Sequence, residues 1–582
     1  MNKNLKQPVK EYKIEIIKNC KININLLSKW FNEVLNLPIE EFFKNEIVDI
    51  CNYVLILNRK LSQVSLIPIF YKGKISEIKD ENDKFIIILE LSYIDLIAQE
   101  FYYKIIDFTF RYIFWMMQKE VTLENIQYFS NKCITELVNP IRNNLPVGKS
   151  RIPVLQEIFN KDIPFIHLGQ GIYQLGWGNK SKKIDRSTID SDSAMGLHLA
   201  QNKISTSNLL KMAGFPTSTQ IIVRTKDELL NSIKELKYPV VVKPIDLDRG
   251  EGVTVNIYDE NRLILAFEEA LSLSKNKAVI VEKQIKGVCY RLFISNNELL
   301  YCVKRLPISL RADGKSSIEE LMDNENIKES NKFFWLEKEF YPKDSLTLEI
   351  LKKAGYSLSS IPKKDTWIEL RDIESTKWGG IDEDMTNLVH PDNLDIAIRA
   401  TNLFGLNVCG VDIITSDISK SWIETDAIIN EINFAPLLGG AQISKSYIPT
   451  FINRFIKDDG RIPMEIFLGK TKECLEKAKL KQQEYIKLGL KSYLTSHDMT
   501  IDENLKTVNF LTKSLSSRVK ALLLNSKVEA LIIVVQNSEL IHGFSPIDKV
   551  SKINIISNEI IDIKTNKNLD EKSFKLLIDK LS

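Results

Sequence analysis

Histidine is scarce in this chain of 582 residues, and none of it lies near the start. Only five histidines are present, and the first of them is His167. Metal sites in proteins draw heavily on histidine and cysteine. The first 160 residues therefore offer no basis for a histidine-based metal site.

Cysteine is equally poor as a source of ligands. The seven cysteines are odd in number and scattered, and no two of them have the spacing of a zinc-binding pair. Such thiols are kept reduced in the cytoplasm. The pattern therefore indicates a cytoplasmic protein without a disulfide framework.

Excess charge and long apolar runs are also absent. Lys and Arg number 79 against 76 Asp and Glu, and the net charge of +3 is too small to indicate a nucleic-acid partner. The first twenty residues lack the apolar core of a secretory signal. The most apolar stretch, residues 84–117, is interrupted by Glu90, Asp95, Glu100, Lys104, Asp107 and Arg111. We expect no membrane insertion.

The length predicts about three to five domains, and the texture of the sequence changes twice. Residues 1–160 mix β-branched runs with longer helical patterns, which is typical of an α+β domain. Residues 161–460 alternate strand-like runs with helical patterns and predict a mixed α/β domain. Residues 461–582 begin with a long charged helix and continue with a helix that leads into a buried strand.

The stretch VVVKPIDLDRGEGV, residues 240–253, joins an apolar strand-like run to a short polar loop. Lys243 brings an ammonium group to the strand end, and Gly250 and Gly252 let backbone N–H groups approach an anion closely. Together they are suited to hold a polyphosphate. On so short a match, a solvated loop between two elements is the simpler alternative.

A second set of polar residues lies far downstream. Asp412, Glu431 and Asn433 stand at the ends of two strand-like runs, and Glu431 and Asn433 share one face of their strand because they are two residues apart. Three oxygen ligands on neighbouring strands suit Mg²⁺ that also holds substrate phosphates. Acidic residues on an edge strand facing water are the alternative.

From about residue 174 to residue 448 the chain contains YQLGWG, AQNKISTSNLLKMAGFP, YPVVVKPIDLDRGEGVTVN, AVIVEKQIKGVCYRLFI, VKRLPISLRADGKSSIEEL, HPDNLDIAIRA and GVDII...INEINFAP. In this order the motifs resemble the ATP-grasp module of the cyanophycin synthetase family. The resemblance implies an enzyme that transfers the terminal phosphoryl group of ATP to a carboxylate. An amine then attacks the acyl phosphate, and ATP and Mg²⁺ are the cofactors.

The resemblance also implies roles for the matching residues. The ATP phosphates would contact Lys203, Lys243 and a loop formed by Asp248, Arg249, Gly250, Glu251 and Gly252. The adenine hinge would be formed by Glu282, Lys283 and their backbone. The metal ligands would be Asp412, Glu431 and Asn433. The candidate catalytic residues are Lys243, Arg291 and Arg371, because a guanidinium suits an acyl phosphate or a substrate carboxylate. Surface ion pairs are the alternative for the two arginines.

The chain departs from the family pattern on the acceptor side. It reads LRDIESTKWGG where family members read LRENANLSTGG, and Asp190 and Asp192 flank the remnant of a serine and threonine cluster. These replacements either change which substrate the enzyme accepts, or they have no role in specificity and only pack against neighbouring residues or face solvent. The candidate substrate-binding residues are Ser193, Lys377, Trp378, Gly379 and Gly380.

Both ends of the chain differ from full-length family members. Residues 51–57, CNYVLIL, replace an EHVALE-like stretch and contain no histidine or acid, so we expect no metal-dependent hydrolase. Residues 460–473, GRIPMEIFLGKTKE, stand where full-length members have the phosphate-binding loop of a Mur-ligase-like module. Of that loop, only Gly469, Lys470 and Thr471 match. Met464 and Ile466 stand where this loop needs its other glycine. We expect a degenerate, truncated Mur-ligase-like domain that acts as scaffold or oligomer interface.

We predict an ATP-dependent carbon–nitrogen ligase with an N-terminal α+β domain (1–160), an ATP-grasp domain (161–460) and a Mur-ligase-like remnant (461–582). The layout most resembles a shortened branch of the family that polymerises preformed β-aspartyl-arginine dipeptides, here onto a cyanophycin-like primer. We expect a homo-oligomer, a dimer or tetramer. One alternative is a ligase for another amino acid or small peptide in a secondary-metabolite pathway. The other is an inactive polymer-binding or regulatory homologue.

Overall fold

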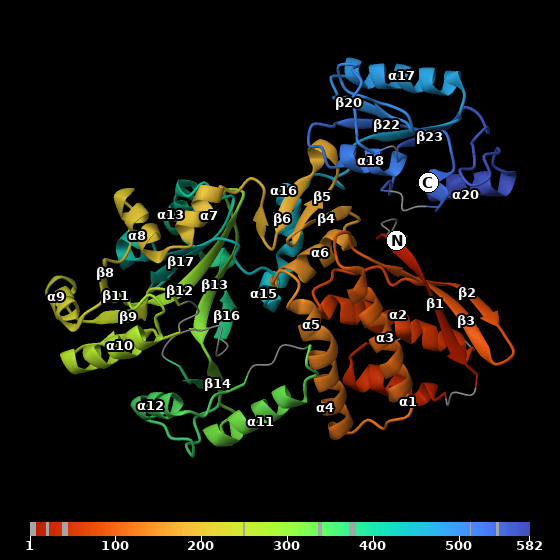
Figure 1. Ribbon diagram of the computed structural model, residues 1–582. Helices are drawn as coiled ribbons and strands as arrows, with labels where there is room; N and C mark the ends of the chain where they lie inside the picture. Colours follow the sequence, from red (N-terminus) through yellow and green to blue (C-terminus); the bar gives the residue numbers. More distant parts are fainter. Residues whose placement is uncertain are drawn as a thin grey trace. The chain divides into compact units, whose positions relative to one another are not determined.

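The computed structural model describes residues 7–18, 22–37, 45–247, 251–335, 340–371, 380–512, 514–542 and 546–581. The chain divides into two compact units. The central unit comprises residues 187–451, and the flanking unit comprises residues 1–186 and 452–582. Figure 1 labels their helices and strands. The predicted multidomain α/β and α+β fold class is confirmed.

The first sheet of the central unit has four antiparallel strands. Val240 and Val242 pack on one face with helices α9 (Lys226–Leu236) and α10 (Glu260–Leu273). Because side chains alternate along a strand, Lys243 lies on the opposite face. The strands, in spatial order, are β10 (Thr254–Ile257), β9 (Val240–Pro244), β11 (Val279–Lys283) and β8 (Gln220–Val223).

The second sheet of the central unit has five antiparallel strands. One face is covered by α13 (Pro391–Leu403), whose Ile396 and Ala400 pack with Leu292, Val411 and other apolar strand residues. The opposite face is thereby left for polar side chains. The strands, in spatial order, are β16 (Gly380–Asp384), β13 (Glu298–Pro307), β12 (Val288–Ser295), β17 (Val408–Thr415) and β18 (Ile428–Asn433).

A small subdomain of the central unit surrounds the strand pair β14 (Ser309–Arg311) and β15 (Trp367–Glu369). Its core joins Leu310 and Ile368 to Ile318 of α11 (Ile318–Asn331) and Leu351 of α12 (Ser345–Lys353). The remaining elements that begin in this unit are β7 (Thr188–Ile189), α7 (Ala194–Ala200), α8 (Lys203–Met212), α14 (Trp422–Thr425), α15 (Gln442–Ser446) and α16 (Ile448–Phe455).

The N-terminal part of the flanking unit contains an antiparallel sheet in the order β1 (Val9–Ile17), β3 (Lys84–Ser92), β2 (Lys74–Asp80). Large buried aromatics such as Trp30, Phe108 and Phe129 contribute to its core. Further strands are β4 (Phe165–Gly169), β5 (Ile172–Leu175) and β6 (Lys182–Asp185). The helices are α1 (Ile24–Lys29), α2 (Glu46–Val64), α3 (Gln99–Met116), α4 (Leu123–Lys132), α5 (Asn139–Arg142) and α6 (Arg151–Asn160).

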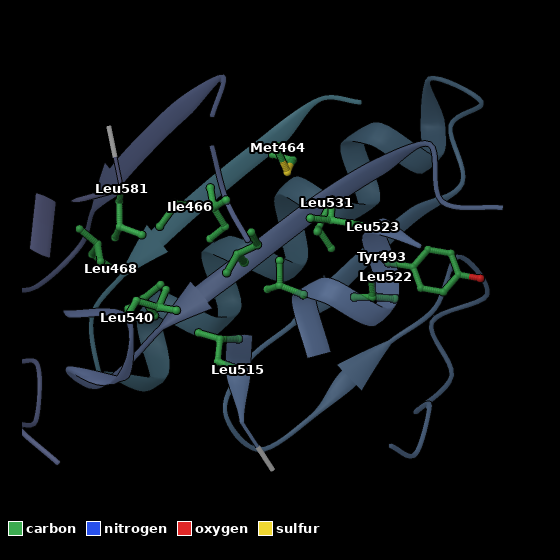
Figure 2. Packing of buried hydrophobic residues seen from close by; sticks show 14 of the residues in the cluster. Met464, Ile466, Leu468, Tyr493, Leu515, Leu522, Leu523, Leu531, Leu540 and Leu581 are labelled. Atoms are coloured by element: carbon green, nitrogen blue, oxygen red, sulfur yellow. The ribbon is translucent and has the colours of Figure 1, made fainter. Parts of the chain in front are cut away.

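The C-terminal part of the flanking unit is a mixed sheet with helices on both faces. Figure 2 shows one of its cores, in which Met464, Ile466 and Leu531 of the sheet meet leucines of the helices. The strands, in spatial order, are β21 (Thr500–Ile501), β20 (Ser492–Thr495), β22 (Ala530–Val535), β19 (Met464–Leu468) and β23 (Lys552–Ile555). The helices are α17 (Lys472–Lys487), α18 (Leu515–Leu523), α19 (Glu539–His542) and α20 (Glu571–Leu581).

No helix in the described part of the chain is long and apolar enough to cross a membrane. The six described cysteines are free thiols.

Candidate active site

Lys243 and Glu282 form an ion pair on the face of the first sheet that lies opposite α9 and α10. The distance from Lys243 Nζ to Glu282 Oε1 is 2.7 Å, and only 13% and 9% of the two side chains are exposed. Gln220 and Ser218 donate to the other carboxylate oxygen at 2.8 and 3.1 Å. A carboxylate this buried needs such partners. The ammonium group is thereby fixed at the end of β9, where a polyphosphate would compete for it.

Lys203 begins α8 and lies beside the loop that follows β9. The N-cap of α8 is Asn202, whose side chain accepts a hydrogen bond from the Ser205 N–H. The Lys203 ammonium donates to the carbonyl of Leu247, the last described residue before the loop. Two lysines from separate elements are therefore brought to one end of β9.

The loop itself is described only in part. Asp248, Arg249 and Gly250 lie outside the described residues, whereas Glu251 and Gly252 lie within them. Gly252 has a φ of +69°, and a Cβ added there would lie 2.8 Å from Pro244 Cγ. The return of the loop to β10 thus requires glycine at this position.

The side chains of both residues predicted to form the adenine hinge are engaged by other groups of the protein. Glu282 binds Lys243, and the Lys283 ammonium donates to the carbonyls of Lys237 and Tyr238 at 3.0 and 2.9 Å. If this segment binds adenine, its backbone N–H and C=O groups would therefore make the hydrogen bonds to the base. That role stays a prediction.

One face of the five-stranded sheet carries a charged residue on every strand. Residues directly opposite each other in paired strands share a face. Arg291 is opposite Asp412, which is opposite Glu431 in turn. Arg291, Asp412 and Glu431 therefore form one row across β12, β17 and β18. Arg305 and Asp382 are opposite each other on the same face, but Arg305 is opposite Cys289, two residues along β13 from Val303, the partner of Arg291. The apolar core against α13 occupies the other face.

Arg291 and Asp412 form a two-pronged ion pair within this row. Arg291 Nε and Nη2 donate to Asp412 Oδ1 and Oδ2 at 2.7 and 2.6 Å. Asp412 is only 2% exposed, and it also accepts a hydrogen bond from the Asn433 amide at 3.2 Å. Two of the predicted metal ligands are therefore in direct contact, with a guanidinium beside them.

Glu431 is influenced by charges from both sheets. Burial and the Asp412 carboxylate raise the pKa of Glu431 above its usual value, while Arg291, Lys203 and Lys243 act in the opposite direction. The two lysines belong to α8 and β9, and Glu431 belongs to β18. The fold therefore brings the predicted phosphate-binding lysines close enough to act electrostatically on a predicted metal ligand.

The donor set of Asp412, Glu431 and Asn433 fits Mg²⁺. The described residues contain no cluster of three or more His, Cys, Asp or Glu able to hold a metal on its own. Two carboxylates and an amide are hard oxygen donors, which suit Mg²⁺ that keeps water and phosphate oxygens as its other ligands. A divalent cation would also offset the burial and the Asp412 charge, which together raise the pKa of Glu431.

Arg371 lies in the small subdomain and is 2% exposed. Its guanidinium donates to Thr347 Oγ1 at 2.6 Å and to Asp344 Oδ2 at 2.6 Å. Asp344 also accepts the Thr347 N–H as N-cap of α12. Arg371 therefore ties β15 to the start of α12, and its predicted role in catalysis remains a prediction.

The predicted substrate residues are described only in part. Ser193 caps α7, and its hydroxyl accepts the Gly196 N–H at 3.1 Å. The neighbouring Asp192 accepts backbone N–H groups of Ile189, Asn407 and Val408, so it stabilises a loop. Gly380 begins β16 opposite Pro307. Lys377, Trp378 and Gly379 lie outside the described residues.

Sequence reasoning missed four polar residues of these two faces. Ser218 and Gln220 hold Glu282. Arg305 and Asp382 are opposite each other on the same face of the second sheet. Burial raises the pKa of Asp382, while Arg305 and Arg291 lower it. Strand alternation places such residues on a face, but it does not tell which strands are neighbours.

The C-terminal glycine loop is preceded by a fully formed strand. Met464 and Ile466 are 1% and 0% exposed within β19. Gly469 has a φ of +145°, and Thr471 caps α17 by accepting the Cys474 N–H. The positions where a phosphate loop would need glycine therefore hold core side chains of the sheet.

Comparisons with known proteins agree with the central motifs. Residues 202–290 match the family Carbamoyl-phosphate synthase L chain, ATP binding domain. The chain is 32% identical over 299 residues to a cyanophycin synthetase of Synechocystis sp., which covers 50% of this chain and 34% of that protein. It is 28% identical over 285 residues to a bifunctional glutathione biosynthesis protein of Mannheimia succiniciproducens, which covers 46% of this chain and 36% of that protein.

Among solved structures, a bifunctional glutathione synthetase from Pasteurella multocida is 21% identical and covers 60% of this chain and 52% of that one. The TM-score of this match is 0.40. The chain spans about a third of the length of the curated relatives it matches.

Proposed function

We propose that this cyanophycin synthetase-like ATP-grasp chain is an ATP-dependent carboxylate–amine ligase. The observation that carries the proposal is a pair of polar clusters on the two sheets. Lys243, held by Glu282, and Lys203 lie at the end of β9. Asp412, which contacts Arg291 and Asn433, is opposite Glu431 in the second sheet. Two cations from one side and two carboxylates from the other are what binding of a metal–polyphosphate requires. Similarity to cyanophycin synthetases over half of the chain supports the same reaction class.

In the proposed reaction, a substrate carboxylate attacks the terminal phosphorus of ATP, which gives an acyl phosphate and ADP. The amine of a second substrate then attacks the acyl carbon and displaces phosphate, so an amide forms and one proton is released. Bound Mg²⁺ would supply positive charge to the phosphoryl oxygens during transfer.

The chain's own groups would orient the reactants. Lys243, fixed by Glu282, would hold the phosphate oxygens, and Lys203 would do so from the start of α8. The loop of residues 248–252 would cover the phosphates. Arg291 is held by Asp412 and would stabilise the acyl phosphate if a cation takes over part of that carboxylate.

For substrates, we propose β-aspartyl-arginine dipeptides and a cyanophycin-like peptide primer. Support comes from the resemblance and from the C-terminal sheet, where buried Met464 and Ile466 stand at the positions in which a second nucleotide loop would need its other glycine. The departures at Lys377 and Trp378 favour one alternative, a ligase for another amino acid or small peptide. We also propose that the chain has three domains, with bounds 1–160, 161–460 and 461–582. The protein is proposed to be a cytoplasmic homo-oligomer.

The test measures ATP-dependent phosphate release by the full chain with dipeptide plus primer, and with a panel of free amino acids. Release with dipeptide plus primer, lost in Lys243→Ala, is the expected result. Release with a free amino acid only would select the alternative ligase. Tight Mg-ATP binding without turnover on any acceptor would contradict a ligase and indicate a binding or regulatory protein.

A further inference from the structure

The N-terminal part of the flanking unit contains a cavity of about 530 Å³ that the proposed ligase does not use. Its walls come from α2, from α6 and from the segment around Phe70–Lys72 (α2 and α6 are labelled in Figure 1). Small-molecule sites typically have volumes of about 300–1,000 Å³. The cavity is therefore large enough for a small organic ligand.

Helix α2 presents one face to this cavity. Ile56, Arg59, Lys60 and Gln63 all line it, and their spacing of three, four and seven residues places them on one side of a helix. Lys72 adds a third cation from the following segment, and its ammonium donates to the Asn52 amide oxygen at 3.2 Å. Of the described residues that line the cavity, none is Asp or Glu.

Arg59 and Lys60 are half-buried, and Lys72 is exposed. Burial lowers the pKa of Arg59. Burial and then the neighbouring Arg59 lower the pKa of Lys60. Both shifts mean that the charged forms are disfavoured in the ligand-free protein. An anion in the cavity would reverse this penalty.

The remaining walls are apolar or carry amides. Ile56, Phe70 and Phe159 are 9%, 3% and 7% exposed, so they form a packed apolar wall. Gln156 and Asn160 of α6 add neutral hydrogen-bonding groups. An apolar wall beside a cluster of cations is suited to a ligand with an anionic head and an apolar body.

We propose that this cavity binds a small organic anion. Its carboxylate or phosphate head lies against Arg59, Lys60 and Lys72, and its apolar part lies against Phe70 and Phe159. The site is independent of the proposed ligase, because none of its lining residues belongs to the central unit.

The test uses isothermal titration of the full chain with phenyl phosphate and with benzoate as probes, and with benzyl alcohol as the neutral control. We expect at least one of the two anions to bind and benzyl alcohol not to bind. Arg59→Gln and Lys60→Gln should each raise the dissociation constant about tenfold, because each removes one charge-assisted contact. Arg59→Lys should retain most of the affinity.

Two further variants distinguish this cavity from the central site. Lys104→Gln removes an exposed cation from α3 and should leave binding unchanged. Lys243→Ala should also leave it unchanged, since Lys243 lies in the central unit. The proposal is overturned if neither anion binds, if benzyl alcohol binds equally well, or if affinity falls in Lys243→Ala and stays constant in Arg59→Gln and Lys60→Gln.

Discussion

Glu431 faces Asp412 across two paired strands, and its surroundings disfavour its charge. Burial and Asp412 raise its pKa, which outweighs the opposing influence of three cations. The ionised Glu431 carboxylate therefore destabilises the ligand-free protein, and a bound cation would stabilise it. Raised carboxyl pKa values are frequent at functional sites for this reason.

Glu431→Gln should remove ligation and at the same time spare stability. A carboxyl with a raised pKa in the folded chain contributes stability at pH values below its usual 4.5, and this contribution is lost as the pH rises through the raised value. The wild-type melting temperature should therefore fall relative to that of Glu431→Gln as the pH rises above 4.5 in Mg²⁺-free and nucleotide-free buffer. Ligation should drop at least about 100-fold.

The control for Glu431→Gln is Glu383→Gln, because Glu383 is an exposed carboxylate of the same sheet. This control should change neither the pH dependence of melting nor ligation. Melting curves measured from pH 4.5 to 8 would contradict the account if the wild-type melting temperature stayed constant or rose relative to that of Glu431→Gln as the pH increased.

At the scale of elements, the connection from β9 to β10 depends on one glycine. Gly252 has a positive φ, and an added Cβ would lie 2.8 Å from Pro244 and 2.9 Å from Leu273. Pro244 belongs to β9 of the first sheet, and Leu273 belongs to α10, which packs on that sheet. The backbone of this loop is therefore set by close packing as well as by conformational preference.

Gly252→Ala should weaken ATP binding, because the loop must shift away from the end of β9. We expect the KM for ATP to rise about tenfold and stability to fall by about 1–2 kcal/mol. Gly214→Ala is a matched control: its φ is +79°, yet an added Cβ meets nothing within 4 Å. It should lose a similar conformational energy without changing the KM. An equal effect of both variants on the KM would disprove the packing argument.

At the scale of the whole molecule, two connections that begin at a strand end are candidates for the nucleotide site: the one from β9 to β10 and the one from β19 to α17. In the central unit, Lys203 and Lys243 act on Glu431, a carboxylate of the second sheet. In the flanking unit, Lys470 follows a strand whose Met464 and Ile466 fill the core shown in Figure 2. Side chains at these positions prevent the backbone from wrapping a phosphate.

Lys470→Ala should therefore leave ATP-dependent ligation within about twofold of the wild type, whereas Lys243→Ala should abolish it. Phosphate release by the two variants at saturating ATP is the measurement. Loss of activity in Lys470→Ala, with unchanged melting temperature, would mean that the C-terminal loop takes part in the reaction.

Much of the site could be predicted from local sequence. Lys243 follows three valines, so a buried strand ending in a cation is the natural prediction, and Gly252 marks the tight return. Glu431 and Asn433 share a face because they are two residues apart. The ion pair between Lys243 and Glu282 could not be predicted, because it depends on β9 and β11 being neighbours.

The sequence by itself determined the alternation of strands and helices and the chemical types of residue that reach the strand ends of the site, since these follow from spacing and backbone preference. Only the tertiary structure decided that Arg291 binds Asp412, that Arg371 ties β15 to α12, and that three cations of the flanking unit share a cavity. The physical reason is that these contacts join residues distant in the chain. Their geometry depends on strand register and on packing, which no local pattern encodes.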